Sequence, residues 1–182
     1  MTKRLAARIK SSVWVAVVAL IVVPGCAQDP TSASPQPSQE TAQKSTKEDR
    51  AIRHLIVEYA ASVGAANTEQ AAQIWSHSPE VSFIHPLGEE HGFDQIKENV
   101  YTRLMGQTFM ERSLQIRDIS VHVYGKAAWA EFNWDFHAKF RKDGSPLTTH
   151  GRESQFYRKE KDGWKLVHVH YSPMPEAKAG NS

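Results

Sequence analysis

Four consecutive segments in the second half of the chain show the period-two alternation of β-strands. They span residues 113–123, 127–140, 148–158 and 164–172. The segments are separated by the turn signals Tyr124-Gly125-Lys126, Lys142-Asp143-Gly144-Ser145 and Lys161-Asp162-Gly163. Such short connections favour hairpins between neighbouring strands, so this region predicts an antiparallel sheet. The alternation shifts by one residue around Arg117-Asp118, which predicts a bend or a bulge there.

Helical periodicity precedes these strands. A first helix is predicted near residues 48–66, and its apolar stripe consists of Ile52, Leu55, Ile56, Tyr59 and Val63. Asn67 is the expected cap of a short second helix that ends near Trp75. A short strand at 81–85 and a third helix from Gly92 to about Met105 follow. The order indicates an α+β domain, with three helices packed on one face of a curved, mostly antiparallel sheet.

The start of the chain has the features of an export signal. Basic residues come first, and an apolar run then covers residues 13–23, which is too short for a stable membrane-spanning helix. The following Val22-Val23-Pro24-Gly25-Cys26 resembles the lipobox of bacterial lipoproteins. We therefore expect a lipoprotein signal peptide at 1–25, and an exported protein anchored to the cell envelope through lipidated Cys26. The alternatives are an ordinary secretory signal and a true transmembrane anchor.

The residues after the signal divide into three parts. Residues 26–47 are rich in Pro, Ser, Thr and Gln, so we expect a disordered tether. The folded domain is expected at 48–174, and a flexible tail at 175–182. Of the 22 basic residues, four lie in the signal, and the remaining 18 face 20 acidic residues. No basic stripe suggests nucleic acid as a partner.

Several short stretches together resemble one family. They are Tyr59, Ile74-Trp75, residues 85–88 with 92–96, and residues 163–172. In this order they are similar to the nuclear transport factor 2-like (NTF2-like) superfamily with its SnoaL-like members. The final stretch is also similar to the association domain of calcium/calmodulin-dependent kinase II. The resemblance implies a cone-shaped cavity between the sheet and the helices, and a homodimer formed through the outer face of the sheet.

Strand alternation sorts the candidate site residues into two groups. In one assignment, the inward residues are Phe132 and Trp134, together with Val167 and Val169 of the last strand. If these residues face the helices, the cone binds a small, mainly apolar molecule. The expected ligand-binding residues are Trp75, Phe93, Phe132, Trp134, Gln155, Tyr157 and Tyr171. The opposite face then holds a polar group that consists of Asp135, His137, Arg152, His168 and His170. The reverse assignment would place this polar group inside the cone, where it could perform acid–base chemistry.

Two further interpretations concern chemistry. An enzyme would be an isomerase, cyclase or dehydratase that needs no cofactor, with His85 or His91 as the base and Tyr59 as a hydrogen-bond donor. His168 and His170 are at the spacing of half a metal site, but structural histidines on a sheet face are the preferred interpretation, and no metal is expected. Arg152 and Glu153 are expected to form a structural ion pair or an interface contact, and an oxyanion partner is the alternative. A purely structural assembly module is the third possible function.

Overall fold

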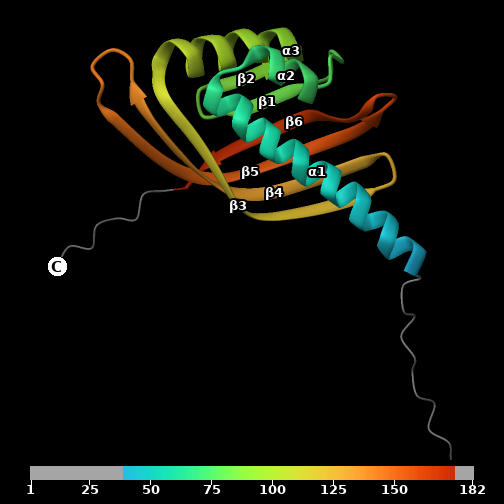
Figure 1. The fold of residues 1–182 in the computed structure, drawn as a ribbon. Coiled ribbons are helices and arrows are strands. Elements are labelled where there is room, and N and C mark those ends of the chain that lie inside the picture. The colour runs from blue at the N-terminus through green and yellow to red at the C-terminus, as the bar shows by residue number, and fades with distance from the viewer. Residues whose placement is uncertain (1–38, 175–182) are drawn as a thin grey trace, which may run out of the picture. The chain divides into compact units, whose positions relative to one another are not determined.

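The computed structural model describes residues 39–174, with side chains from residue 47 onward (Figure 1). The predicted signal peptide, Cys26, most of the predicted tether and the tail lie outside the described residues. Three helical regions lie against one face of a curved six-stranded sheet (Figure 1). The helical regions are α1 (Gln39–Ala65), α2 (Thr68–Ile74) and α3 (Gly92–Gln95), which continues as the π-helix η1 (Ile96–Thr108).

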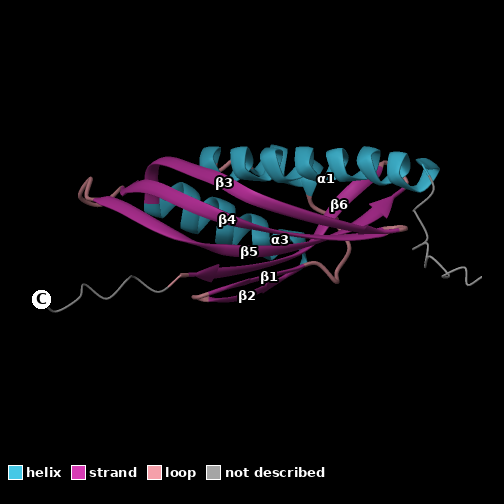
Figure 2. Cartoon of the chain, turned by 90° about the horizontal axis from the view of Figure 1, so that it is seen from below, coloured by secondary structure: helices cyan, strands magenta, loops and turns pink. Residues whose placement is uncertain are grey.

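The strands form a mixed sheet in the order β2-β1-β6-β5-β4-β3. They are β1 (Ser82–His85), β2 (Gly88–His91), β3 (Phe109–Tyr124), β4 (Ala127–Phe140), β5 (Pro146–Glu160) and β6 (Gly163–Pro173). All neighbouring pairs are antiparallel except β1 and β6, which are parallel. Figure 2 shows how the long strands cross beneath α1. The predicted α+β cone fold is confirmed. The short strand predicted at 81–85 is β1, and β2, which pairs with it in a hairpin, was not predicted.

Helix α1 packs on the sheet through the predicted stripe. Ile52, Ile56, Tyr59 and Val63 are buried, and Leu55 is partly buried. The helix begins at Gln39, inside the segment that we expected to be a disordered tether. No helix within residues 39–174 combines the length and the apolar composition that crossing a bilayer requires.

The third helical region differs from the prediction in its geometry. It changes from α-helix to π-helix at Ile96 and ends at Thr108 rather than near Met105. In a π-helix the backbone hydrogen bonds join residues five apart, which changes the positions that share a face. Tyr101, which the α-helical pattern left out of the apolar side, is therefore fully buried together with Val100.

Two bulges in β3 and one irregularity between β5 and β6 set which side chains face inward. The bend predicted near Arg117-Asp118 is confirmed by a register shift, and Asp118 has a positive φ of 56°. On β6 the pairing shifts at Val167, because Phe156 pairs with His168 whereas Tyr157 pairs with Leu166. The prediction for this strand was therefore partly wrong: Leu166 is fully buried and Val167 is only partly buried.

Trp134 forms the centre of the sheet's inner face. It pairs with Gly151 across β4 and β5, and its ring stacks on Tyr171 with 4.4 Å between ring centroids. A Cβ atom at Gly151 would overlap both the Trp134 indole and the carbonyl oxygen of Ser172. Because Gly151 has no side chain, the Trp134 ring can lie over β5 and stack on Tyr171 of β6. Strand β6 borders the functional site.

Candidate active site in the cone

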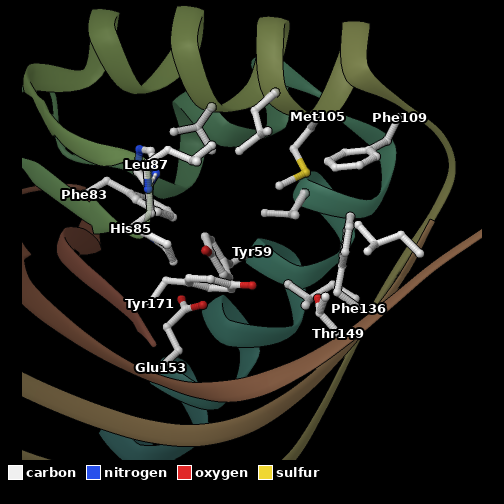
Figure 3. Close-up of a pocket in the computed structure, with 16 residues that line it drawn as sticks. Tyr59, Phe83, His85, Leu87, Met105, Phe109, Phe136, Thr149, Glu153 and Tyr171 are labelled. Carbon is white, nitrogen blue, oxygen red and sulfur yellow. Dashed lines mark hydrogen bonds between the residues drawn. The ribbon is translucent and has the colours of Figure 1, made fainter. Parts of the chain in front are cut away.

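A cavity of about 200 Å³ lies between the sheet, α1 and η1 (Figure 3). Most of its wall is apolar, and its polar groups come from five residues. The lining consists of Tyr59, Val63, Phe83, His85, Pro86, Leu87, Val100, Leu104, Met105, Phe109, Leu114, Phe136, Leu147, Thr149, Glu153 and Tyr171. Leu87 is 77% exposed, so the cavity reaches the surface beside the turn between β1 and β2.

Glu153 is a carboxyl group buried in this apolar wall. It lies on the inner face of β5, between Phe132 of β4 and Tyr171 of β6, and is only 2% exposed. Figure 3 shows Glu153 beside Tyr59 and Tyr171 at one end of the cavity. Burial raises the pKa of Glu153 to about 8, although hydrogen bonds from Gln155 and Tyr59 act in the opposite direction. Near neutral pH the pocket therefore contains a carboxylic acid that can both donate and accept a hydrogen bond.

The phenol groups around this acid stay protonated. Burial, and then the charge of Glu153, raises the pKa of Tyr59 well above its ordinary value. Burial raises the pKa of Tyr171 to about 12. Both hydroxyls are consequently hydrogen-bond donors over the physiological pH range.

His85 lines the cavity beside the turn between β1 and β2. Its Nδ1 accepts a hydrogen bond from the backbone N–H of Leu87 at 3.3 Å. Its buried Nε2 has no hydrogen-bond partner among the described residues and lies 3.5 Å from Glu90 Oε1. Glu90 is held by Asn99, whose Nδ2 donates to Oε2 at 2.6 Å. His91 is an exposed residue that lies 3.5 Å from Glu89 and does not line the cavity.

The other predicted ligand-binding residues occupy different positions. Tyr171 lines the cavity, whereas the remaining six are buried in the core beside it. These six are Trp75, Phe93, Phe132, Trp134, Gln155 and Tyr157. Phe132, Trp134, Gln155 and Tyr157 point inward on their strands, as the alternation predicted, but none of the six lines the cavity.

The polar group lies on the outer face of the sheet. Asp135 forms a two-point ion pair with Arg117, at 2.9 and 3.2 Å, which holds the pKa of Asp135 below its usual range. His137 shares a hydrogen bond with Thr148 at 3.1 Å, and His168 shares one with Ser82 at 2.8 Å. Burial, and then the charge of His170, lowers the pKa of His168. No three His, Cys, Asp or Glu side chains in the described part of the chain gather as metal ligands.

The expected ion pair between Arg152 and Glu153 is wrong. Adjacent residues of a strand point to opposite faces, so Arg152 is exposed on the outside while Glu153 is inside the cone. The alternation that placed Gln155 and Tyr157 inside also placed Glu153 there. A carboxyl group on the strand face that is predicted to point inward was the signal that could have identified it.

Sequence and structure comparisons agree with this fold. A family model described as the SnoaL-like domain matches residues 52–176. The chain belongs to this SnoaL-like family. A search of curated proteins found no match.

Solved structures of the wider superfamily resemble this SnoaL-like chain. An NTF2-like superfamily protein from Salmonella enterica serovar Typhimurium LT2 is 41% identical, with a TM-score of 0.71, over 76% of this chain and 99% of its own. A presumed scytalone dehydratase from Novosphingobium aromaticivorans is 16% identical, with a TM-score of 0.66, over 74% and 89%. A hexachlorocyclohexane dehydrochlorinase is 11% identical, with a TM-score of 0.61, over 76% and 95%. The last two likenesses show the shared fold.

Proposed function

We propose that this SnoaL-like domain binds a small, uncharged, mainly apolar molecule in its cone, and that Glu153 meets the polar group of that molecule. The buried acid in an apolar wall is the observation that carries the proposal. An apolar cavity of about 150 Å³ already accommodates benzene, so a cavity of about 200 Å³ suits a molecule with one ring. An anionic ligand would find no positive charge beside Glu153, whose hydrogen-bond partners Gln155 and Tyr59 are uncharged.

A matched pair of ligands tests this proposal. Acetophenone and α-methylstyrene have nearly the same shape, but only acetophenone has a carbonyl oxygen that can accept a hydrogen bond. Because protonated Glu153 donates, acetophenone should bind roughly two- to tenfold more tightly at pH 6. At pH 9 the carboxyl group is mainly ionised, so the part of this advantage that Glu153 supplies should be lost and the affinity ratio should fall. Isothermal titration calorimetry of the full chain measures both affinities.

A Glu153→Gln variant provides the control for that experiment. Its amide donates a hydrogen bond at every pH, so the preference for acetophenone should become independent of pH. An affinity ratio in the unmodified protein that is equal at pH 6 and pH 9 would contradict the role of Glu153. Failure of both molecules to bind would contradict an apolar binding site of this size.

Catalysis is a second candidate function, favoured by the pKa of Glu153. A group that titrates near pH 8 can both take and return a proton near neutral pH. The ionised carboxylate would remove a proton from a carbon next to a carbonyl and return it to another carbon, which moves a double bond without a cofactor. Tyr59 would donate to the oxygen on which charge develops.

Deuterium exchange from D₂O into a bound ketone tests this chemistry and can be measured by NMR. The exchange should be lost in Glu153→Gln. Exchange at the same rate in Glu153→Gln and in the unmodified protein would exclude Glu153 as the base.

The location and assembly of the protein are proposed from the sequence alone. Lipidation of Cys26 would hold the domain at the bacterial cell envelope, and the polar outer face of the sheet would form a homodimer. After expression in a bacterial host, a Cys26→Ser variant should move from the membrane fraction to the soluble fraction. Its sedimentation should then correspond to a dimer. Retention of Cys26→Ser in the membrane fraction would contradict anchoring through the lipidated cysteine. Sedimentation as a monomer would contradict the homodimer.

A further inference from the structure

Three polar side chains follow one another on the inner face of β5. Glu153, Gln155 and Tyr157 alternate along the strand, and each is at most 2% exposed. Gln155 Nε2 donates a hydrogen bond to Glu153 Oε1 at 2.7 Å, and the Tyr157 hydroxyl donates to Gln155 Oε1. Only Glu153 of the three borders the cavity, so the chain of hydrogen bonds runs from the core to the site.

The direction of these hydrogen bonds follows from the donors that must be satisfied. A carbonyl oxygen only accepts, so the contact with Gln155 Oε1 satisfies the buried O–H of Tyr157. The amide of Gln155 then presents Nε2 to Glu153. If the amide were reversed, Nε2 would face the Tyr157 oxygen, and the Tyr157 proton would lose this acceptor. An unsatisfied buried donor is costly, which favours the first arrangement.

We propose that Gln155 and Tyr157 are positioning residues that keep the acidic proton of Glu153 on Oε2, and that Oε2 is the oxygen that meets the ligand. Gln155 N–H donates to Oε1. The carbonyl oxygen of a carboxylic acid accepts a hydrogen bond better than its hydroxyl oxygen does, so this contact favours the proton on Oε2. The site would therefore select ligands with a hydrogen-bond acceptor, such as a ketone or an ether. This inference rests on the proposed function for its ligand class, whereas the arrangement of the proton can be tested without any ligand.

The two amide orientations predict opposite effects of one substitution. In the proposed orientation, Gln155 donates to the carboxylate and lowers the pKa of Glu153. In the reversed orientation, the amide oxygen would accept from the protonated acid and raise that pKa. Gln155→Met retains the length of the side chain but removes both possibilities, so the sign of the change reports the orientation.

The experiment is a pH titration of the Glu153 carboxyl carbon by ¹³C NMR in the full chain without ligand. The signal is assigned by its absence in Glu153→Gln. We expect Gln155→Met to raise the midpoint by about one to two pH units, because a hydrogen bond to a charged group is lost. Tyr157→Phe should raise the midpoint by a smaller amount, because the amide becomes free to turn its oxygen toward the acid.

Tyr101→Phe provides the matched control. It also removes a buried hydroxyl, which bonds to Ser62 at 3.0 Å, but it leaves the Glu153–Gln155–Tyr157 chain intact. Its midpoint should equal that of the unmodified protein. A lower midpoint in Gln155→Met, or an unchanged midpoint in both Gln155→Met and Tyr157→Phe, would overturn the proposal. These results do not depend on acetophenone, so failure of the ligand to bind would contradict the proposed function and leave this inference standing.

Discussion

The unfolding free energy of the protein should fall by about 4–5 kcal/mol between pH 4.5 and pH 8 because of Glu153 alone. The pKa of Glu153 is about 8 in the folded protein, against a model value of 4.5. Between these values the folded state retains a proton that the unfolded state releases, so the unfolded state binds fewer protons and stability decreases as pH rises. Above pH 8 both states are ionised, and the contribution becomes constant. Urea denaturation at several pH values measures this slope.

Substitution by glutamine isolates the effect from all other titrating groups. Glu153→Gln retains the size and hydrogen bonding of the side chain but cannot ionise, so its stability should lack this decrease and exceed that of the unmodified protein at pH 8. Glu131→Gln, on the outer face of β4, changes an exposed carboxyl group and should leave the slope unaltered. Parallel stability curves for the unmodified protein and Glu153→Gln would show that Glu153 is not buried in an apolar site.

Gly151→Ala should destabilise the fold by about 3 kcal/mol or more. The added methyl group would overlap the Trp134 indole and the Ser172 carbonyl oxygen, and neither can move freely, because Trp134 is fully buried and Ser172 is paired in the sheet. Displacement of Trp134 would also disturb Tyr171, which stacks on it and lines the cavity. We therefore expect a lower midpoint of urea denaturation and weaker binding of acetophenone by the folded fraction.

Gly64→Ala is the matched control for this substitution. Gly64 lies in α1, where a new Cβ atom would be 3.7 Å from the nearest atom, an ordinary contact distance. Alanine is favoured over glycine inside a helix by about 1 kcal/mol, so this variant should be as stable as the unmodified protein or more so. Equal stabilities of Gly151→Ala and Gly64→Ala would contradict the packing of Trp134 over Gly151.

The sequence allowed the fold and one face of the sheet to be predicted, because hydrophobic periodicity determines both. On β4, every second residue from Ala128 to Ala138 is buried, as the alternation indicated. Glu153 follows the same rule and could have been placed in the cone. It was instead assigned to an ion pair with Arg152, its neighbour in sequence, although adjacent strand residues point in opposite directions.

Other features depend on tertiary packing and leave little trace in local sequence. The apolar pattern of residues 93–104 fits an α-helix, and nothing in it indicates the change to π-helical hydrogen bonding at Ile96. The shift at Val167 arises from pairing between β5 and β6 and reverses which residues of the final strand face the core before Val167, but not after it. The hydrogen bond from Gln155 to Glu153 connects two side chains whose orientation only the assembled sheet determines.

The most direct test of the central claim is the carboxyl titration of Glu153 in the unmodified protein, with and without saturating acetophenone. A buried acid that donates to the ligand should titrate with a midpoint of about 8 alone. The ligand should raise this midpoint, because it binds the protonated form more tightly. A midpoint near 4.5 that acetophenone does not change would contradict both the burial of the acid and its contact with the ligand.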